Sequence, residues 1–199
     1  MEFTLKRNVQ VVAYVLLALV VTQAVFTVLF GAGISGPGPY IWGVEVVLFS
    51  FLAAFAGAAM LQAKRFHLGW AAIALGSVLN VVQVTIGLTL FGPFGGVAKE
   101  VEAAGPLIGA IVAFSFMVYN AAKILLGLAA LVFGKAKMNA GSKTLGGLTA
   151  LVGGVAIVAN SLLIIFGRES FLPPPVGGAS GVIATVLLAL CLITLVHDE

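Results

Sequence analysis

Six long apolar stretches, separated by short breaks, constrain this chain more than any other feature. They cover residues 9–30, 41–63, 69–91, 106–133, 145–166 and 179–196. An α-helix needs about 20 mostly apolar residues to cross a bilayer. Only 9% of the residues are charged, against about 25% in a soluble domain, so the chain could not cover a water-facing surface. The sequence predicts an all-α integral membrane protein, with one six-helix transmembrane domain over residues 1–199.

The first stretch follows two basic residues, an arrangement that is also typical of a signal peptide. Residues 9–30 are longer than the apolar region of a signal peptide, which has about 7–15 residues. We therefore interpret this stretch as the first membrane span.

Basic residues are divided unevenly between the two sides of the predicted bundle. Lys99 and Arg168 fall in the third and fifth breaks, and seven others fall at the N-terminus or in the second and fourth breaks: Lys6, Arg7, Lys64, Arg65, Lys135, Lys137 and Lys143. Cytoplasmic loops are rich in Lys and Arg. We expect both termini to be cytoplasmic, and we expect the protein to lie in a bacterial inner membrane. The net charge of +3 follows this topology, so nucleic acid is not expected as a partner.

The same orientation predicts that the two tryptophans, Trp42 and Trp70, lie at opposite membrane interfaces, where amphipathic rings act as anchors. Three consecutive prolines predict a stiff, apolar connection at residues 171–175, before the last span.

A Phe-Gly pair ends the first, third and fifth stretches, at residues 30–31, 91–92 and 166–167. A Gly/Pro-rich break and a returning span follow each pair, which predicts three two-helix hairpin repeats of the kind that some transporters contain. However, Phe133-Gly134 ends the fourth stretch at the opposite side. A glycine just past a helix end is also an ordinary cap, so both interpretations stay open.

Lys123 lies close to the middle of the fourth stretch, and Asn120 lies on the same helical face. An ammonium group at the bilayer centre costs about 2.5–3.5 kcal/mol on insertion scales. One interpretation is a buried cation that binds an anionic group or takes part in proton or ion coupling. The other is a lysine whose charged end reaches back to the cytoplasmic interface along its own apolar stem.

Further polar residues at membrane depth have two interpretations each. Glu45 is either a proton or cation site at the mouth of a pathway or a carboxylate that water still reaches near the outer interface. Asn80, Gln83, Asn120 and Asn160, together with Gln23, either join helices through hydrogen bonds of about 0.6 kcal/mol or line a polar pocket. The predicted substrate-binding set is Lys123, Asn120, Asn80, Gln83, Asn160 and Glu45.

Small residues recur at four-residue spacing on the predicted helices. The fifth stretch carries Gly146, Ala150 and Gly154 on one stripe, with Gly153 beside it. Such stripes let helix backbones approach closely in a membrane. They favour a bundle interior for the polar residues, and they leave open self-association or binding to another membrane protein in addition to membrane lipids.

The sequence offers little material for a built-in cofactor. Both histidines, His67 and His197, lie outside the six stretches, and Cys191 is the only cysteine. A haem held between helices would need a histidine inside a span, so neither a haem nor a metal centre is expected.

Three functions remain open at this point. The first is a small transporter or channel-like protein that binds a polar or anionic solute at the mid-membrane cluster. The second is a non-catalytic accessory subunit or lipid-binding scaffold of a larger membrane complex. The third, an intramembrane enzyme, has the least support, because Glu45 and Lys123 are the only ionisable pair at membrane depth and such chemistry needs converging groups.

Overall fold

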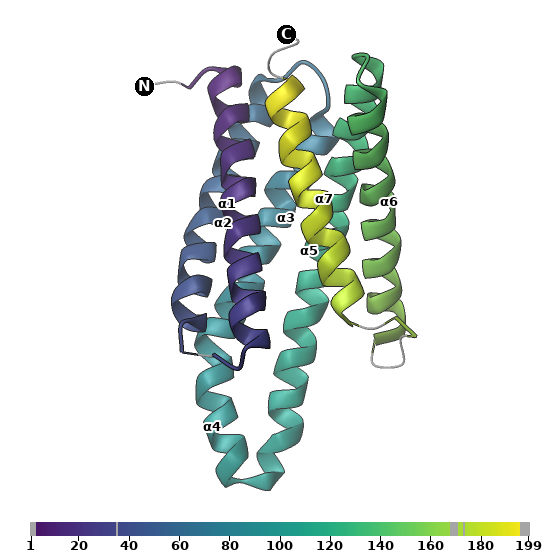
Figure 1. Cartoon of the computed structure of the whole chain (residues 1–199). Helices are drawn as coiled ribbons and strands as arrows, with labels where there is room; N and C mark the ends of the chain where they lie inside the picture. The colour runs from purple at the N-terminus through teal and green to yellow at the C-terminus, as the bar shows by residue number, and fades with distance from the viewer. Residues whose placement is uncertain (1–2, 35, 168–170, 173, 196–199) are drawn as a thin grey trace.

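The computed structural model describes residues 3–34, 36–167, 171–172 and 174–195, and the described residues are helical with no strand (Figure 1). The helices are α1 (Leu5–Gly31), α2 (Gly38–Gln62), α3 (His67–Ile86), the π-helical segment η1 (Gly87–Phe91), α4 (Gly92–Glu100), the short 3₁₀ turn η2 (Glu102–Ala104), α5 (Gly105–Asn139), α6 (Lys143–Phe166) and α7 (Pro174–Leu195). Six helices are long and apolar enough to cross a membrane, which confirms this part of the prediction.

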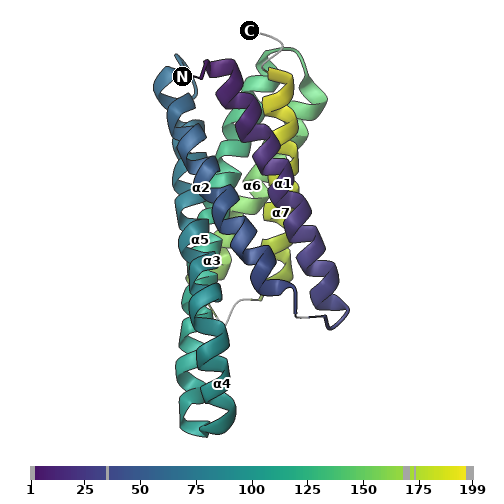
Figure 2. The same ribbon diagram turned by 90° about the vertical axis from the view of Figure 1, so that its left-hand side faces the viewer.

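The long helices contact one another in chain order around a ring, and α7 closes the ring against α1. A further contact between α5 and α7 crosses the ring, so α6 packs on the outside against these two helices alone. Figures 1 and 2 show α1 beginning and α7 ending at the same end of the bundle, together with the α2–α3 connection. This end is called the basic end below, because Lys6, Lys64 and Arg65 lie there.

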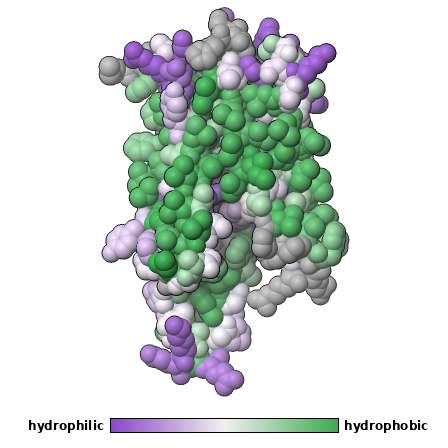
Figure 3. All heavy atoms as spheres, in the orientation of Figure 1, coloured by the Kyte–Doolittle hydropathy of each residue, from purple (hydrophilic) through white to green (hydrophobic). Residues whose placement is uncertain are grey.

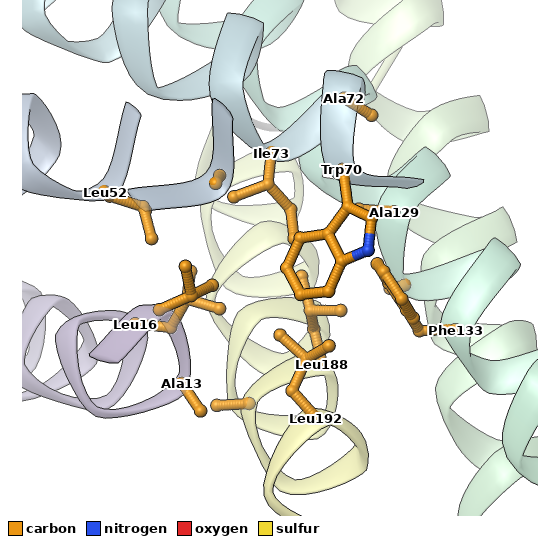
Figure 4. Packing of buried hydrophobic residues seen from close by; sticks show 14 of the residues in the cluster. Ala13, Leu16, Leu52, Trp70, Ala72, Ile73, Ala129, Phe133, Leu188 and Leu192 are labelled. Atoms are coloured by element: carbon orange, nitrogen blue, oxygen red, sulfur yellow. The ribbon is translucent and has the colours of Figure 1, made fainter. Parts of the chain in front are cut away.

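The apolar core fills the half of the ring nearest the basic end. Leu16, Leu52, Ile73 and Leu188, from four different helices, are each fully buried and point toward one another in Figure 4. On α1 the buried residues end at Leu19. The remaining, outer part of α1 is more exposed, whereas α3 still carries the buried residues Val84 and Ile86 toward that end.

Trp70 belongs to this core, which corrects one prediction. The two tryptophans do lie near opposite ends of the bundle, but Trp70 is only 4% exposed and packs edge-on against Phe133, with ring centroids 4.8 Å apart. It therefore does not face lipid as an anchor. Trp42 is half-buried against Phe26 and Phe91.

The closest helix contact, between α5 and α6, depends on glycine. A Cβ atom added at Gly134 would lie 2.6 Å from the backbone N of Ala150 and 2.8 Å from the carbonyl O of Gly146. Seven residues away, a Cβ at Gly127 would lie 2.9 Å from the carbonyl O of Gly153. The backbones touch where these glycines oppose each other, as the small-residue stripe predicts. Gly154 has nothing within 4 Å, so it is not part of the contact.

The third break was predicted as a loop, and the structure corrects this prediction. The helix runs without interruption from His67 to Glu100, about 50 Å at 1.5 Å per residue, and α5 returns from a short turn beside it. The π-helical segment ends just before Pro93, which lies in the first turn of α4, where a missing backbone N–H is tolerated. The resulting hairpin extends beyond the other helices in Figures 1 and 2.

Two of the four Phe-Gly pairs end a helix. α1 ends at Gly31, and α6 ends at Phe166 with Gly167 in a left-handed region at φ 52°. The pair at residues 91–92 lies inside the hairpin, and Gly134 lies at the α5–α6 contact, so neither of these glycines is the predicted cap. The structure therefore does not show a hairpin repeat.

The last helix begins earlier than predicted. α7 starts at Pro174 and not near residue 179, so two of the three consecutive prolines belong to its first turn, a favoured place for proline. The remaining proline, Pro173, lies outside the described residues.

The surface in Figure 3 shows a broad apolar band between two hydrophilic zones. One zone lies at the basic end and the other at the tip of the hairpin, where Lys99, Glu100 and Glu102 are exposed. Such a band is what a bilayer requires of the helices it surrounds.

Candidate functional site

Lys123 lies in the interior of the ring with 1% of its surface exposed. Its Nζ donates a long hydrogen bond of 3.4 Å to Oε1 of Gln23 on α1 and lies 4.9 Å from the centroid of the Tyr119 ring. The helices α1 and α5 are not neighbours in the ring, so this side chain reaches across the interior. No carboxylate oxygen of a described residue lies within 4.0 Å of its ammonium group.

The direction of the lysine side chain bears on its two interpretations. Tyr119 precedes Lys123 by one helical turn, and side chains on a helix lean toward its N-terminus. The ammonium group accordingly points away from the basic end. It does not reach back to the interface at that end, as the second interpretation required.

The acidic residue of the predicted set also contacts α1, one residue away from the lysine contact. Glu45 on α2 is 6% exposed, and its Oε1 accepts a hydrogen bond of 2.8 Å from Thr22. Thr22 and Gln23 are adjacent, so α1 contacts the acid and the ammonium group through consecutive residues. The two charges attract each other but form no ion pair. The carboxylate is buried rather than held in water at the interface.

Glycines of α7 form one wall of the lysine site. A Cβ at Gly181 would lie 2.6 Å from Cδ of Lys123, and a Cβ at Gly178 would lie 3.5 Å from the hydroxyl of Tyr119. The lysine stem therefore lies in a space that α7 provides by lacking a side chain. We call Lys123, Gln23, Tyr119, Glu45 and Thr22, with this glycine wall, the lysine cluster.

The predicted amides do not all join this cluster through hydrogen bonds. Asn80 donates to the carbonyl O of Gly76 in its own helix at 2.9 Å. Gln83 joins α3 to α5 through a 3.3 Å hydrogen bond to Ser115. Both contacts stabilise helices or their packing. The contact of Gln83 joins two helices, as one of the two interpretations has it, whereas the bond of Asn80 stays within α3.

Asn160 is buried where α6 meets α7. Its Nδ2 donates to the carbonyl O of Ala156 at 2.8 Å and, weakly, to that of Gly177 at 3.4 Å. Its Oδ1 is buried and has no hydrogen-bond partner among the described residues. A Cβ at Gly177 would lie 3.1 Å from that oxygen, so α7 again provides space beside a polar group.

The register of α5 and α6 brings Asn120 to the level of Asn160. The touching pairs Gly134–Gly146 and Gly127–Gly153 are seven residues apart on each helix, and another step of seven on each reaches Asn120 and Asn160. This step corresponds to about two helical turns. Asn120 is 7% exposed, so the seven-residue step that begins at the glycine contact leads to a buried amide on each helix.

The lysine cluster lies farther from the basic end than the apolar core does, at the level where α1 becomes exposed. Gln23 is half-buried, whereas Val25 and Val28 are exposed. In Figure 3 the apolar band has a hollow with paler and hydrophilic atoms between the lower parts of α1 and α7. Gln23 therefore lies at the boundary between the buried and the exposed parts of α1.

Sequence reasoning missed Thr22 and Tyr119 of the lysine cluster, and also Ser115, the partner of Gln83. Thr22, Tyr119 and Ser115 are common residue types in apolar stretches, and which of them faces the interior depends on helix rotation. A signal was present in α7, where Gly177, Gly178 and Gly181 share one face of a helix.

The fold and the cluster define a class: an α-helical membrane protein with a lysine buried among helices. No protein-family model matches the chain, no curated protein matches it, and no solved structure matches it. The site must therefore be interpreted from its own geometry.

Proposed function

We propose that this protein is a small transporter or channel-like protein that binds an anionic solute, or a solute with a carboxylate group, at the lysine cluster. The observation that carries the proposal is the burial of Lys123 without an ion-pair partner among the described residues. Desolvating a charge is costly unless a counter-charge compensates for it, and lysines inside membrane spans commonly mark substrate or ion pathways.

The donor capacity of the ammonium group supports an anionic ligand. A lysine ammonium has three N–H donors, and Gln23 accepts one of them at 3.4 Å. The face of the Tyr119 ring adds electrostatic attraction but accepts no strong hydrogen bond. An incoming carboxylate or inorganic anion would supply both the missing acceptors and the missing negative charge.

Glu45 has a second role in this proposal. It is buried and hydrogen-bonded to Thr22, the residue next to the lysine's partner Gln23, and it partly offsets the positive charge without neutralising it at contact distance. An anion held by the lysine would be opposed by this carboxylate, which favours release over tight binding. Conduction and transport both need a ligand that can leave.

Flux through reconstituted protein tests this proposal. Liposomes containing wild-type protein are expected to take up a small anion from a panel of chloride, acetate, phosphate and succinate faster than empty liposomes. Lys123→Met is expected to abolish the uptake. Lys135→Met removes an exposed lysine from the same helix and should leave it unchanged. Equal flux in wild type and Lys123→Met would contradict the proposal.

We also propose that the basic end faces the cytoplasm of a bacterial cell, across its inner membrane. Seven of the lysines and arginines lie at this end, and Lys99 lies at the opposite hairpin tip, the asymmetry that sets orientation. Single cysteines in a Cys191→Ser background test the orientation. A cysteine at position 99 should react with a membrane-impermeant maleimide on intact cells, and one at position 135 should not.

A second candidate, an accessory subunit or scaffold in a larger complex, is favoured by one observation. The hairpin formed by α4 and the beginning of α5 extends past the ends of the other helices (Figure 2), and α4 contacts no described helix outside this hairpin. Val97, Val101 and Leu107 on it are about half exposed. An apolar surface that extends past the other helices is suited to contact with another membrane protein or a second copy of the chain.

Gentle extraction from native membranes separates the two candidates. A stoichiometric partner that is lost in a Val97→Asp, Val101→Asp double variant, with no anion bound to the wild type, would support the accessory role. A bound anion that disappears in Lys123→Met would support the transporter.

A further inference from the structure

A recess of about 490 Å³ lies at the basic end of the ring, far from the lysine cluster along the helices. Its residues come from α1, the α2–α3 connection, α3, α5 and α7. They include Val9, Trp70, Phe133 and Leu192, which are buried apolar residues of the core. The volume lies within the range of about 300–1,000 Å³ typical of small-molecule sites.

Two basic residues belong to the same recess. Lys64 and Arg65 line it and are exposed, and neither forms an ion pair with a described residue. An apolar floor with an unpaired cationic border is complementary to an anionic amphiphile. A neutral lipid would leave the two cationic side chains without a counter-charge. A free sugar would leave the apolar floor without an apolar partner.

The residue after the basic pair has an unusual backbone. Phe66 adopts a left-handed conformation at φ 63°, the only non-glycine residue with positive φ in the described chain. Bulky residues rarely adopt it, and such strain is concentrated at binding sites. The ring centroids of Phe66 and Phe133 are 5.9 Å apart, and both residues line the recess.

Trp70 adds an unpaired polar group to the wall. The residue is 4% exposed and lines the recess, and its indole N–H has no hydrogen-bond partner among the described residues. The indole N–H is a donor only. An acceptor oxygen of a ligand would satisfy it.

We propose that this recess binds one anionic phospholipid of the leaflet at the basic end. The headgroup phosphate contacts Lys64 and Arg65, and acyl-chain carbons pack against Trp70, Phe133 and Leu192. A phospholipid is favoured over a soluble anion because most of the lining is apolar and the recess is at the level where basic residues meet anionic headgroups. This site is independent of the proposed function at Lys123.

Fluorescence of Trp70 tests the proposal directly. The chain has two tryptophans, so Trp42→Phe leaves Trp70 as the single reporter in the full-length protein. Phosphatidylglycerol with brominated acyl chains, diluted into phosphatidylcholine bilayers, is expected to quench Trp70 more strongly than brominated phosphatidylcholine at the same fraction. Annular lipid alone should quench a buried tryptophan weakly and without headgroup preference.

Matched variants identify the charges involved. Lys64→Gln with Arg65→Gln is expected to reduce the phosphatidylglycerol preference by roughly 10- to 30-fold, given the attraction of each basic residue to anionic lipid. Lys135→Gln with Lys143→Gln removes the same charge from exposed positions outside the recess and should preserve the preference. Ala63→Phe, which places bulk in the recess without changing its charge, should reduce quenching by both lipids.

Three results would overturn the proposal. They are the absence of headgroup preference in the single-tryptophan protein, equal preference in the two double variants, and loss of the preference on addition of inorganic phosphate, which would indicate a free-anion site. Lys123→Met should retain the lipid preference, so failure at either site is distinguishable from failure at the other.

Discussion

The two faces of α5 pack in opposite ways. Toward α6, Gly127 and Gly134 bring backbone against backbone, with so little space that a Cβ would meet main-chain atoms at less than 3 Å. Toward the ring interior, the same helix carries Lys123 and Tyr119, whose side chains reach across to α1 and α7. At its glycines the first face leaves no room for a side chain, and the other face encloses a charge.

This contrast separates structural from functional roles within one helix. Close glycine contacts stabilise a membrane bundle through dispersion and short backbone distances. A buried, unpaired ammonium group does the reverse, since burial of a charge costs free energy. We therefore expect that the bundle does not need Lys123 for its stability and that the α5–α6 contact stabilises that side of the fold.

The largest effect is expected from overpacking the glycine face. Gly134→Leu should lower the free energy of unfolding by about 3 kcal/mol or more, because the new side chain would clash with the α6 backbone. Unfolding by sodium dodecyl sulfate from mixed micelles, followed by circular dichroism, measures this change.

Gly154→Leu on α6 is the matched control. Nothing lies within 4 Å of a Cβ there, so the change should be within about 0.5 kcal/mol. Equal destabilisation by the two variants would mean that the α5–α6 contact is not as close as the structure has it.

A smaller effect is expected from narrowing the interior face. Gly181→Ala would place a methyl group 2.6 Å from Cδ of Lys123, and the flexible stem can move away at little cost in stability. The displaced ammonium group should bind its anion about tenfold more weakly, corresponding to about 1.4 kcal/mol, in equilibrium titrations of the purified protein. Gly178→Ala meets the Tyr119 hydroxyl at an ordinary 3.5 Å and should bind as the wild type does. Unchanged affinity in both variants would place the anion elsewhere.

The smallest effect is expected on anion affinity when the negative charge of Glu45 is removed. Glu45→Gln keeps an acceptor for the Thr22 hydroxyl but removes the negative charge that acts on Lys123. Anion affinity should rise because the repulsion between Glu45 and the anion is lost. The rise should be only a few-fold, because the interaction weakens with the distance between the two charges. The same titrations measure it. A lower affinity would indicate that Glu45 organises the site or couples a proton, not that it opposes the ligand.

The sequence predicted the parts of this fold that depend on local composition. Six apolar stretches gave six helices, and the stripe containing Gly146 and Ala150 does meet another helix. The hairpin was missed because glycines and Pro93 read as a loop, whereas a π-helical segment ahead of that proline lets the helix continue. Trp70 was placed at an interface from its position along the chain, which says nothing about whether it faces lipid or core.

The candidate site was predictable only in its ionisable members. Lys123 and Glu45 stand out because charges are rare in apolar stretches. Their partners Thr22 and Tyr119 depend on the rotation of α1 and α5 about their axes, which the uniformly apolar sequences of these helices do not fix. The amides on α3 and α6 were grouped by depth alone, and the structure gives them hydrogen bonds within α3 and to α5 and α7 instead.

The most direct test measures thermal unfolding of detergent-solubilised wild type and Lys123→Met, each with and without the anion that shows flux. A ligand that binds only the folded state raises its stability by RT ln(1 + [L]/Kd). We expect Lys123→Met to unfold at the same temperature as wild type or higher, and we expect the anion to raise the Tm of wild type alone. A variant that unfolds well below wild type, yet responds equally to the anion, would show that Lys123 supports the fold and does not bind the solute.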